Sequence, residues 1–187
     1  VQDIFMTETA WFADVILPAT AHAEKLGTYT NTNRQVQIGR NVVEPPKGVK
    51  QDWWIIQEIA KRIGLNWNYT SPKEIFDEMK LIMPSLNYIS WERLEKENYV
   101  TYPVKSENIL GEDIIFQDGF PTPNKLGKIM PVDLIYPNDE ISSDFPMILS
   151  TGRLLEHWHT GTMTRRALVL DELEPVPIIF INEIDSK

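Results

Sequence analysis

The stretch Ser150-Thr-Gly-Arg-Leu-Leu-Glu-His-Trp-His-Thr-Gly-Thr-Met-Thr-Arg-Arg166 is unusually rich in groups that bind ligands. Its arginines are planar cations suited to phosphate or carbonyl oxygens, and its glycines let backbone N–H groups approach a ligand closely. Three flat rings and four threonine hydroxyls add stacking surfaces and short donors. The apolar residues 147–149 just before it predict a short buried strand, and α/β proteins bind ligands where strands end. The ordinary alternative is a solvated connection anchored by one Trp.

Composition narrows the class of protein. The 187 residues allow one or two domains, and 42% hydrophobic and 24% charged residues are typical of a globular protein. A net charge of −9 argues against a nucleic-acid partner. The sequence has no Cys, which excludes disulfides and iron–sulfur ligation within these residues. It has no apolar run that could span a membrane. The chain begins without an initiator Met, which indicates an internal fragment of a longer protein.

The first half predicts an α/β pattern of short elements. Residues 1–6 and 13–18 are apolar runs typical of buried parallel strands, with one or two helical turns between them at 7–12. The polar, Gly-containing segment 24–37 is typical of irregular backbone.

Three helices are predicted after a Pro-Pro break at residues 45–46. The first covers about 52–63, with Asp52 as N-cap and an inward face of Trp53, Ile56, Ile59, Ala60 and Ile63. The second begins at a capping box, Ser71-Pro-Lys-Glu74, and runs to about residue 82, with Ile75, Phe76 and Met79 facing inward. The third runs from Ser90 to about residue 97, with Trp91 and Leu94 inside and the charges of 92–97 on a solvated face.

The second half gives weaker patterns because prolines interrupt it. Residues 114–116, 128–132 and 178–181 are candidate short strands. Residues 138–144 are polar and turn-rich, which predicts a linker between two domains.

Several common chemistries lack a candidate. The histidines are His22, His157 and His159, too few and without Cys for a zinc site. There is no nucleophile with an adjacent base, no phosphate-binding GxxxxGK[ST] motif and no GxGxxG motif. Cofactor binding is the chemistry that remains.

Two runs carry a resemblance to a known family. TGRLLEHWHTGTMTRR resembles the loop that opens the C-terminal dinucleotide-binding domain of molybdopterin oxidoreductases, especially formate dehydrogenase large subunits and periplasmic-type nitrate reductases. ADVILPA followed by EKLGTYTNTNRQVQ resembles the family's ADVxLPxxxxxEKxGTxxNxERRxQ run, with departures at Asn33 and Gln35. VQDIFMTETA, QDWWIIQEIAKRIG and TRRALVLDELEP are more similar to formate dehydrogenases than to nitrate reductases.

The resemblance implies a fold and a cofactor. Residues 1–140 would be the C-terminal part of a Rossmann-like αβα core, and 145–187 the beginning of a β-barrel dinucleotide-binding domain. The cofactor would be bis(molybdopterin guanine dinucleotide) carrying Mo or W. Its phosphates, guanines and pterin edges call for cations, an Asp carboxylate and polar side chains, respectively. The expected cofactor-binding residues are Gln2, Asp3, Lys25, Asp52, Thr151, Gly152, Arg153, Leu154, Leu155, Glu156, His157, Trp158, His159, Thr160 and Gly161.

The implied activity is oxidation of formate to CO2 in the cytoplasm. The resemblance places the metal-ligating Cys or selenocysteine and a 4Fe–4S cluster upstream, so no catalytic residue and no metal ligand are expected in this chain. Electrons would pass through iron–sulfur or flavin partner subunits to an acceptor such as NAD. The alternatives are a nitrate reductase or other molybdopterin oxidoreductase, and a non-catalytic structural relative in a respiratory complex. The complete TGRLLEHWHTGTMTRR loop counts against the last.

Overall fold

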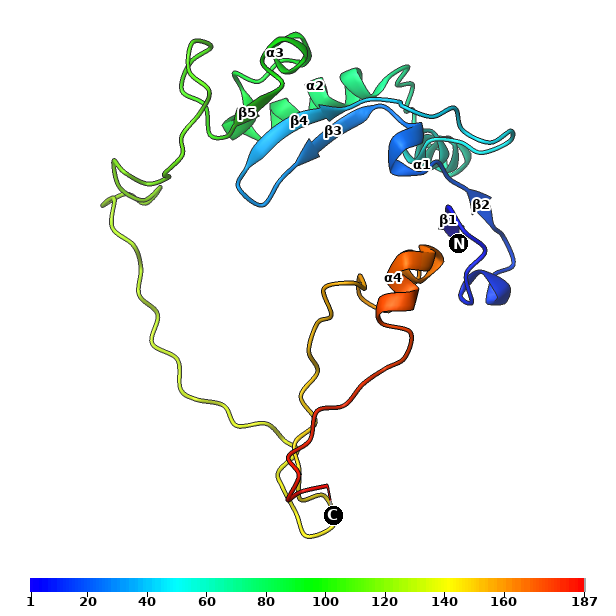
Figure 1. The fold of residues 1–187 in the computed structure, drawn as a ribbon. Coiled ribbons are helices and arrows are strands. Elements are labelled where there is room, and N and C mark those ends of the chain that lie inside the picture. Colours follow the sequence, from blue (N-terminus) through cyan, green and yellow to red (C-terminus); the bar gives the residue numbers. More distant parts are fainter. Residues whose placement is uncertain (187) are drawn as a thin grey trace. The chain divides into compact units, whose positions relative to one another are not determined.

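The computed structural model describes residues 1–186. The chain divides into two compact units, unit 1 (Val1–Ile129) and unit 2 (Met130–Lys187). Most helices and strands belong to unit 1 (Figure 1). The predicted domains, 1–140 and 145–187, stay a prediction, because a compact unit alone does not establish a domain.

The chain begins with a small parallel sheet. Strand β1 (Gln2–Asp3) pairs with β2 (Leu17–Pro18), so that Gln2 lies opposite Leu17. A 3₁₀ helix, Ala10–Phe12, connects the strands. The predicted order of strand, helical turn and strand is therefore present, with shorter strands than the apolar runs suggested.

A second sheet is antiparallel and has the order β3–β4–β5. Its strands are β3 (Gly27–Thr30), β4 (Gln35–Gly39) and β5 (Tyr99–Thr101). A second 3₁₀ helix, His22–Glu24, precedes β3. The prediction of irregular backbone for 24–37 is wrong. Local polarity concealed the strands, because β4 is stabilised by pairing with β5, more than sixty residues later in the chain.

The three predicted helices are present. They are α1 (Asp52–Arg62), α2 (Pro72–Ile82) and α3 (Trp91–Glu97), and a 3₁₀ helix, Pro84–Leu86, follows α2. Ser71 Oγ accepts from Glu74 N at 3.4 Å, as the capping box predicted. Gly64, after α1, has φ of +93°, the left-handed conformation expected at a helix C-terminus.

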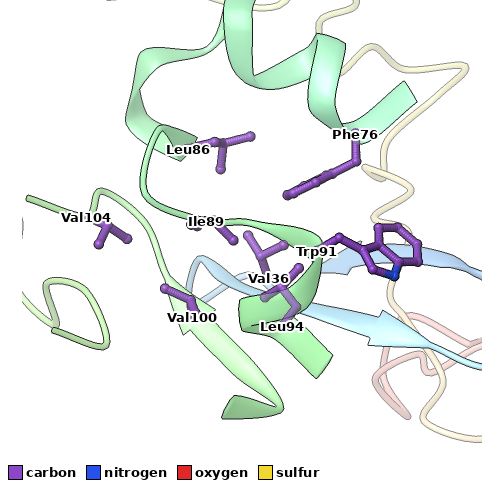
Figure 2. Packing of buried hydrophobic residues seen from close by; sticks show 8 residues of the cluster. All are labelled: Val36, Phe76, Leu86, Ile89, Trp91, Leu94, Val100 and Val104. Carbon is purple, nitrogen blue, oxygen red and sulfur yellow. The ribbon is translucent and has the colours of Figure 1, made fainter. Parts of the chain in front are cut away.

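One hydrophobic core joins the antiparallel sheet to α2 and α3. Figure 2 shows eight of its side chains. The core comprises Val36, Phe76, Leu86, Ile89, Trp91, Leu94, Val100 and Val104. Val36 and Val100 are paired across β4 and β5, and Phe76 meets Trp91 edge to face with ring centroids 6.4 Å apart. The predicted inward positions Phe76, Trp91 and Leu94 are confirmed.

The predicted inward face of α1 is wrong for most of its residues. Ile55, Gln57 and Ala60 are buried, whereas Ile63 is 72% exposed and Ile56 and Ile59 are also exposed. Gln57 is buried because its side chain binds a loop: its Nε2 donates to Tyr69 O, and its Oε1 accepts from Tyr69 N. The prediction for Met79 of α2 is also wrong, since this side chain is exposed.

The charged run of α3 was predicted to lie on a solvated face. One of its residues, Arg93, is buried instead. Arg93 is only 8% exposed, and its guanidinium donates to the backbone oxygens of Tyr88, Ser106 and Ile109. Its Nε also lies 2.8 Å from Glu97 Oε2. The guanidinium thus supplies donors to an irregular segment with few backbone partners of its own.

Several predicted strands are not strands in the structure. Residues 114–116, 128–132, 147–149 and 178–181 have no strand conformation. Unit 2 contains a 3₁₀ helix, Thr164–Arg166, and α4 (Leu168–Leu173). An apolar run becomes a strand only when a neighbouring segment pairs with its backbone, and the described part of unit 2 supplies none. The chain therefore has mixed helix and sheet content, and the Rossmann-like core and β-barrel stay predictions.

Ser90 provides a first test of the fold. Its Oγ accepts from Arg93 N at 3.1 Å and caps α3, so we expect Ser90→Ala to lower the free energy of unfolding by about 1 kcal/mol. Ser90→Asp keeps an acceptor and should retain most of the stability. Urea unfolding followed by tryptophan fluorescence measures both; equal losses in the two variants would contradict the cap.

Candidate functional site

Three segments of unit 1 run parallel and end at one edge of the small sheet. β1 and β2 are paired, and Ala19 forms a parallel bridge with Lys50. Thr20 N donates to Lys50 O at 3.1 Å, which brings the end of β2 beside the chain that enters α1. Carboxyl ends of parallel strands meet at one edge, and this is where α/β proteins bind ligands.

The carboxylate of Asp52 is the centre of a polar cluster at this edge. Lys25 Nζ lies 2.5 Å from Asp52 Oδ2, and Gln2 Nε2 donates to Asp52 Oδ1 at 2.7 Å. We call these three residues the Asp52 cluster. Three of the four site residues predicted in this unit are thus brought together, although 27 and 50 positions separate Lys25 and Gln2 from Asp52.

Asp52 is the first residue of α1, and Gln51 is the N-cap. The predicted N-cap role of Asp52 is therefore wrong. Gln51 arrives in an extended conformation from the bridge at Lys50, which shifts the helix start by one residue. The Asp52 carboxylate is consequently available to Lys25 and Gln2.

The Asp52 cluster changes the acidity of its carboxyl. Partial burial raises the pKa of Asp52, but the hydrogen bonds from Lys25 and Gln2 and the charge of Lys25 outweigh it, so the pKa lies below the ordinary 3.8. Asp52 is therefore ionised at neutral pH. An ionised carboxylate is a pure acceptor, with spare lone pairs for the N–H groups of a ligand.

We expect acid to remove the stabilisation that this cluster contributes. The folded-state pKa is lowered, so the contribution is complete above the unfolded-state value and is lost as pH falls through the folded-state value. Asp52→Asn should lower the urea midpoint near neutral pH and have little effect at about pH 2. The pair is partly exposed, so the loss should be below about 1 kcal/mol. Asp14→Asn, at an exposed carboxylate, is the control, and an Asp52→Asn effect that is the same at both pH values would contradict the ion pair.

Asp3 is not part of the cluster. Its Oδ1 accepts from the backbone N–H groups of Ile4 and Phe5 at 2.7 and 3.2 Å, which shapes the turn after β1. The carboxylate accepts from backbone N–H groups of its own loop, as Asp often does at a turn. The structure thus places Asp3 at the end of β1, in a local backbone role.

The groups at this edge fit the implied dinucleotide. No side chain caps the N-terminus of α1, because Gln51 Oε1 accepts from Trp53 Nε1 instead. The Thr20 hydroxyl, in a residue that is 2% exposed, has no hydrogen-bond partner among residues 1–186. An uncapped helix start favours anions, and an ionised carboxylate favours the N–H edge of a purine. Sequence reasoning missed Thr20 because the hydroxyl stands out only once its burial is known.

A hollow of about 280 Å³ adjoins the cluster. Lys25 and Asp52 lie on its wall, and apolar side chains of α2 and the aromatic rings of Tyr29 and Trp53 form much of the rest. Such a combination of one charged group with flat apolar walls suits a heterocyclic ligand.

The other predicted site residues lie in unit 2, in the loop 151–161. Thr151, Gly152 and Arg153 are exposed, and Arg153 forms no hydrogen bond or ion pair with residues 1–186. No atom lies within 4 Å of the position that a Cβ on Gly152 would take. This half of the loop therefore has room for an anion, and its predicted role in binding the cofactor stays a prediction. The Leu155 side chain is also almost fully exposed, while Leu154 and Glu156 are partly buried.

The second half of the loop is folded on itself. His157 is buried, with Thr164 Oγ1 3.1 Å from its Nδ1 and Glu174 O 2.8 Å from its Nε2. The rings of Trp158 and His159 stand outside in an edge-to-face pair with centroids 4.7 Å apart. Thr160 Oγ1 is 3.2 Å from the hydroxyl of Thr162.

Gly161 is required by the turn that closes this loop. Its φ is +80°, and an added Cβ would lie 2.8 Å from the Arg165 side chain. Its N–H donates to Trp158 O, and its carbonyl accepts from Arg165 N, both at 2.9 Å. Gly161 therefore has a clear conformational role, and its predicted cofactor contact stays a prediction.

A larger hollow, of about 500 Å³, surrounds Arg34. The Arg34 guanidinium donates to the carbonyls of Tyr102, Glu112 and Asp113. Lys105, on the same wall, pairs with Glu112 and Asp118, and these hydrogen bonds raise its pKa to about 12. Both cations are thus used by the protein itself, which gives this hollow little affinity for an anion.

Residues 1–186 contain neither a cluster of metal ligands nor a membrane-spanning helix. No group of three or more His, Asp or Glu side chains within this range could hold a metal ion. No helix of the described chain has the length and apolar character needed to cross a membrane.

Comparison with known proteins finds a family model and several relatives that match this chain. Residues 1–62, which contain the whole Asp52 cluster, match the family model of molybdopterin oxidoreductases. The F420-dependent formate dehydrogenase subunit alpha of Methanocaldococcus jannaschii is 44% identical over 189 residues, covering 100% of this chain. The chain belongs to the molybdopterin oxidoreductases. The recognition of this family from TGRLLEHWHTGTMTRR and ADVILPA is confirmed.

Two further relatives carry similar names. The F420-dependent formate dehydrogenase 2 subunit alpha of Methanococcus maripaludis is 41% identical over 189 residues, again covering 100% of this chain. A putative formate dehydrogenase of Bacillus subtilis is 39% identical over 183 residues, or 97% of the chain. The chain spans 28% of the length of the first two relatives and 18% of the third.

Proposed function

We propose that this chain is the part of a formate dehydrogenase alpha subunit that holds bis(molybdopterin guanine dinucleotide). The subunit would oxidise formate to CO2 and pass two electrons from Mo or W, through iron–sulfur clusters, to partner subunits. The observation that carries the proposal is the Asp52 cluster, which lies within the residues that match the family model. The chain contributes binding groups, and no catalytic residue or metal ligand is assigned to it.

Each chemical part of the cofactor has a suitable group. Asp52, kept ionised by Lys25, can accept from the N–H donors on a guanine edge. Arg153 and the N-terminus of α1 suit phosphates. Trp158 and His159 offer flat faces to a pterin or a base. When bound, the cofactor would supply the redox chemistry, while these residues bind and orient it.

The electron acceptor is a separate question. NAD was expected from the sequence, whereas the relatives from Methanocaldococcus jannaschii and Methanococcus maripaludis are named F420-dependent. The names of these relatives, both alpha subunits, favour a multi-subunit enzyme, and we propose F420 as the acceptor to test beside NAD.

The decisive experiment uses the complete subunit, purified anaerobically. We expect two guanine nucleotides per Mo or W and formate-dependent reduction of a dye. The same cofactor content without formate activity would move the substrate to nitrate or another oxyanion. Absence of metal and guanine would mean a structural relative and would overturn the proposal. With partner subunits present, reduction of F420 compared with NAD identifies the acceptor.

A further inference from the structure

The buried ring of His157 touches two neutral groups in unit 2. Its Nε2 lies 2.8 Å from the backbone oxygen of Glu174, and its Nδ1 lies 3.1 Å from Thr164 Oγ1. The Thr164 hydroxyl also accepts from Trp158 N at 3.1 Å. His157 is 8% exposed, so both ring nitrogens are committed to the protein.

The backbone partner of the ring places a proton on Nε2. A backbone carbonyl only accepts, so Nε2 must carry the proton that binds Glu174 O. In the Nε2–H tautomer, Nδ1 accepts from the Thr164 hydroxyl, whose lone pair accepts from Trp158 N–H. Each donor has one acceptor in this arrangement.

A second set of contacts closes the same segment. Arg165 Nη1 lies 2.9 Å from Asp171 Oδ1 and also reaches the backbone oxygens of Glu174 and Pro175. Glu174 O therefore accepts from both His157 and Arg165. The loop, the 3₁₀ helix and α4 are tied into one closed segment, residues 157–175.

We infer that His157 is a positioning residue: as the neutral Nε2–H tautomer it locks Thr164, and Thr164 holds the backbone of Trp158. The role rests on the proposed function for the identity of the ligand, since the loop would present Trp158 and His159 to it. Trp158 is 62% exposed, and the His159 ring has no hydrogen-bond partner among residues 1–186. The rings of Trp158 and His159 are the ligand-facing groups, and His157 acts on them only through Thr164, which binds the backbone of Trp158. His157 is thereby removed from direct contact with the cofactor.

The test uses the complete subunit and measures two quantities separately: protection of the Trp158 amide by Thr164, and retention of the cofactor. Hydrogen–deuterium exchange, read by mass spectrometry on peptides covering 155–163, reports the Trp158 amide. Bound guanine reports cofactor retention. We expect Thr164→Val to speed Trp158 amide exchange about tenfold and to lower guanine content, because the hydroxyl is lost at nearly constant volume. Thr164→Ser keeps the hydroxyl and should restore both.

Variants of His157 distinguish positioning from direct contact. His157→Ala should show the same two losses, and His157→Gln, which keeps a donor for Glu174 O, should recover part of both. Peptides covering 86–101 control for general unfolding. An unchanged Trp158 exchange rate in Thr164→Val would overturn the inference. So would guanine loss in His157→Ala with the Trp158 amide still protected, because that pattern means direct contact. A wild-type subunit without guanine would refute the proposed function. The exchange rates would still test whether His157 and Thr164 hold the Trp158 amide.

Discussion

Arg93→Met should lower the free energy of unfolding by about 3 kcal/mol, the largest stability effect expected from a single side chain here. The guanidinium is buried and donates to the backbone oxygens of Tyr88, Ser106 and Ile109. Met fills a similar volume but removes the donor of these part-buried carbonyls, and each hydrogen bond from a charged group contributes about 1.5–3 kcal/mol. Urea unfolding followed by tryptophan fluorescence measures the loss.

Two variants of the same helix serve as comparisons for Arg93→Met. Arg93→Lys keeps the charge but cannot reach three carbonyls in a fork, so we expect it to recover less than half of the lost stability. Lys96→Met removes an exposed cation from α3 and should change the free energy of unfolding by at most about 0.5 kcal/mol. If Arg93→Met were no worse than Lys96→Met, the buried guanidinium would have no structural role.

Arg153→Ala should have the largest effect on the cofactor. Arg153 is exposed and forms no hydrogen bond or ion pair within residues 1–186, so its guanidinium is available to a phosphate. A charge-assisted hydrogen bond contributes about 1.5–3 kcal/mol, which corresponds to roughly 10–100-fold weaker retention. Guanine and metal content of the purified subunit, after dialysis, measures the loss. The melting temperature of cofactor-free protein should remain unchanged, because no protein contact is removed, whereas that of the loaded protein should fall with the lost cofactor.

Lys128→Ala is the matched control for Arg153→Ala. Lys128 is also exposed, and its removal changes the net charge equally. We expect wild-type guanine content in this variant. Wild-type content in Arg153→Ala as well would show that Arg153 does not hold the phosphates, and the exposed half of the loop would lose its proposed role.

Helix positions were predictable because their signals are local. The Ser71 capping box, the Ser90 cap and Gly64 mark the ends of α1, α2 and α3 without reference to distant residues. The inward face of α1 was not predictable. Gln57 is buried because it satisfies the backbone of Tyr69, and that loop must be folded before the advantage exists.

The structural roles of Arg93 and Arg34 could not be predicted from the sequence, for a related reason. In the sequence each is one charge among several, and a charged run usually predicts a solvated face. Their partners are backbone carbonyls, such as Ile109 O for Arg93 and Glu112 O for Arg34, which no residue pattern reveals. The same holds for the hydroxyl of Thr20, whose significance depends on its burial.

Three of the residues proposed for the site lie together in the structure. The residues Gln2, Lys25 and Asp52 came from family motifs, and the structure brings them within hydrogen-bonding distance. The motif could not show that Lys25 and Gln2 act on Asp52, nor that His157 faces inward while Trp158 faces outward.

The sequence by itself determined the family and the three helices of unit 1, because family motifs and helix caps are formed by residues close together in the sequence. The site residues it proposed stay a prediction. Tertiary structure alone decided the antiparallel sheet, in which β4 gains its partner from β5. It also decided the ionised state of Asp52 and the commitment of His157 to Thr164 and Glu174. Pairing, burial and charge interaction depend on which distant residues meet, and that information exists only in the folded chain.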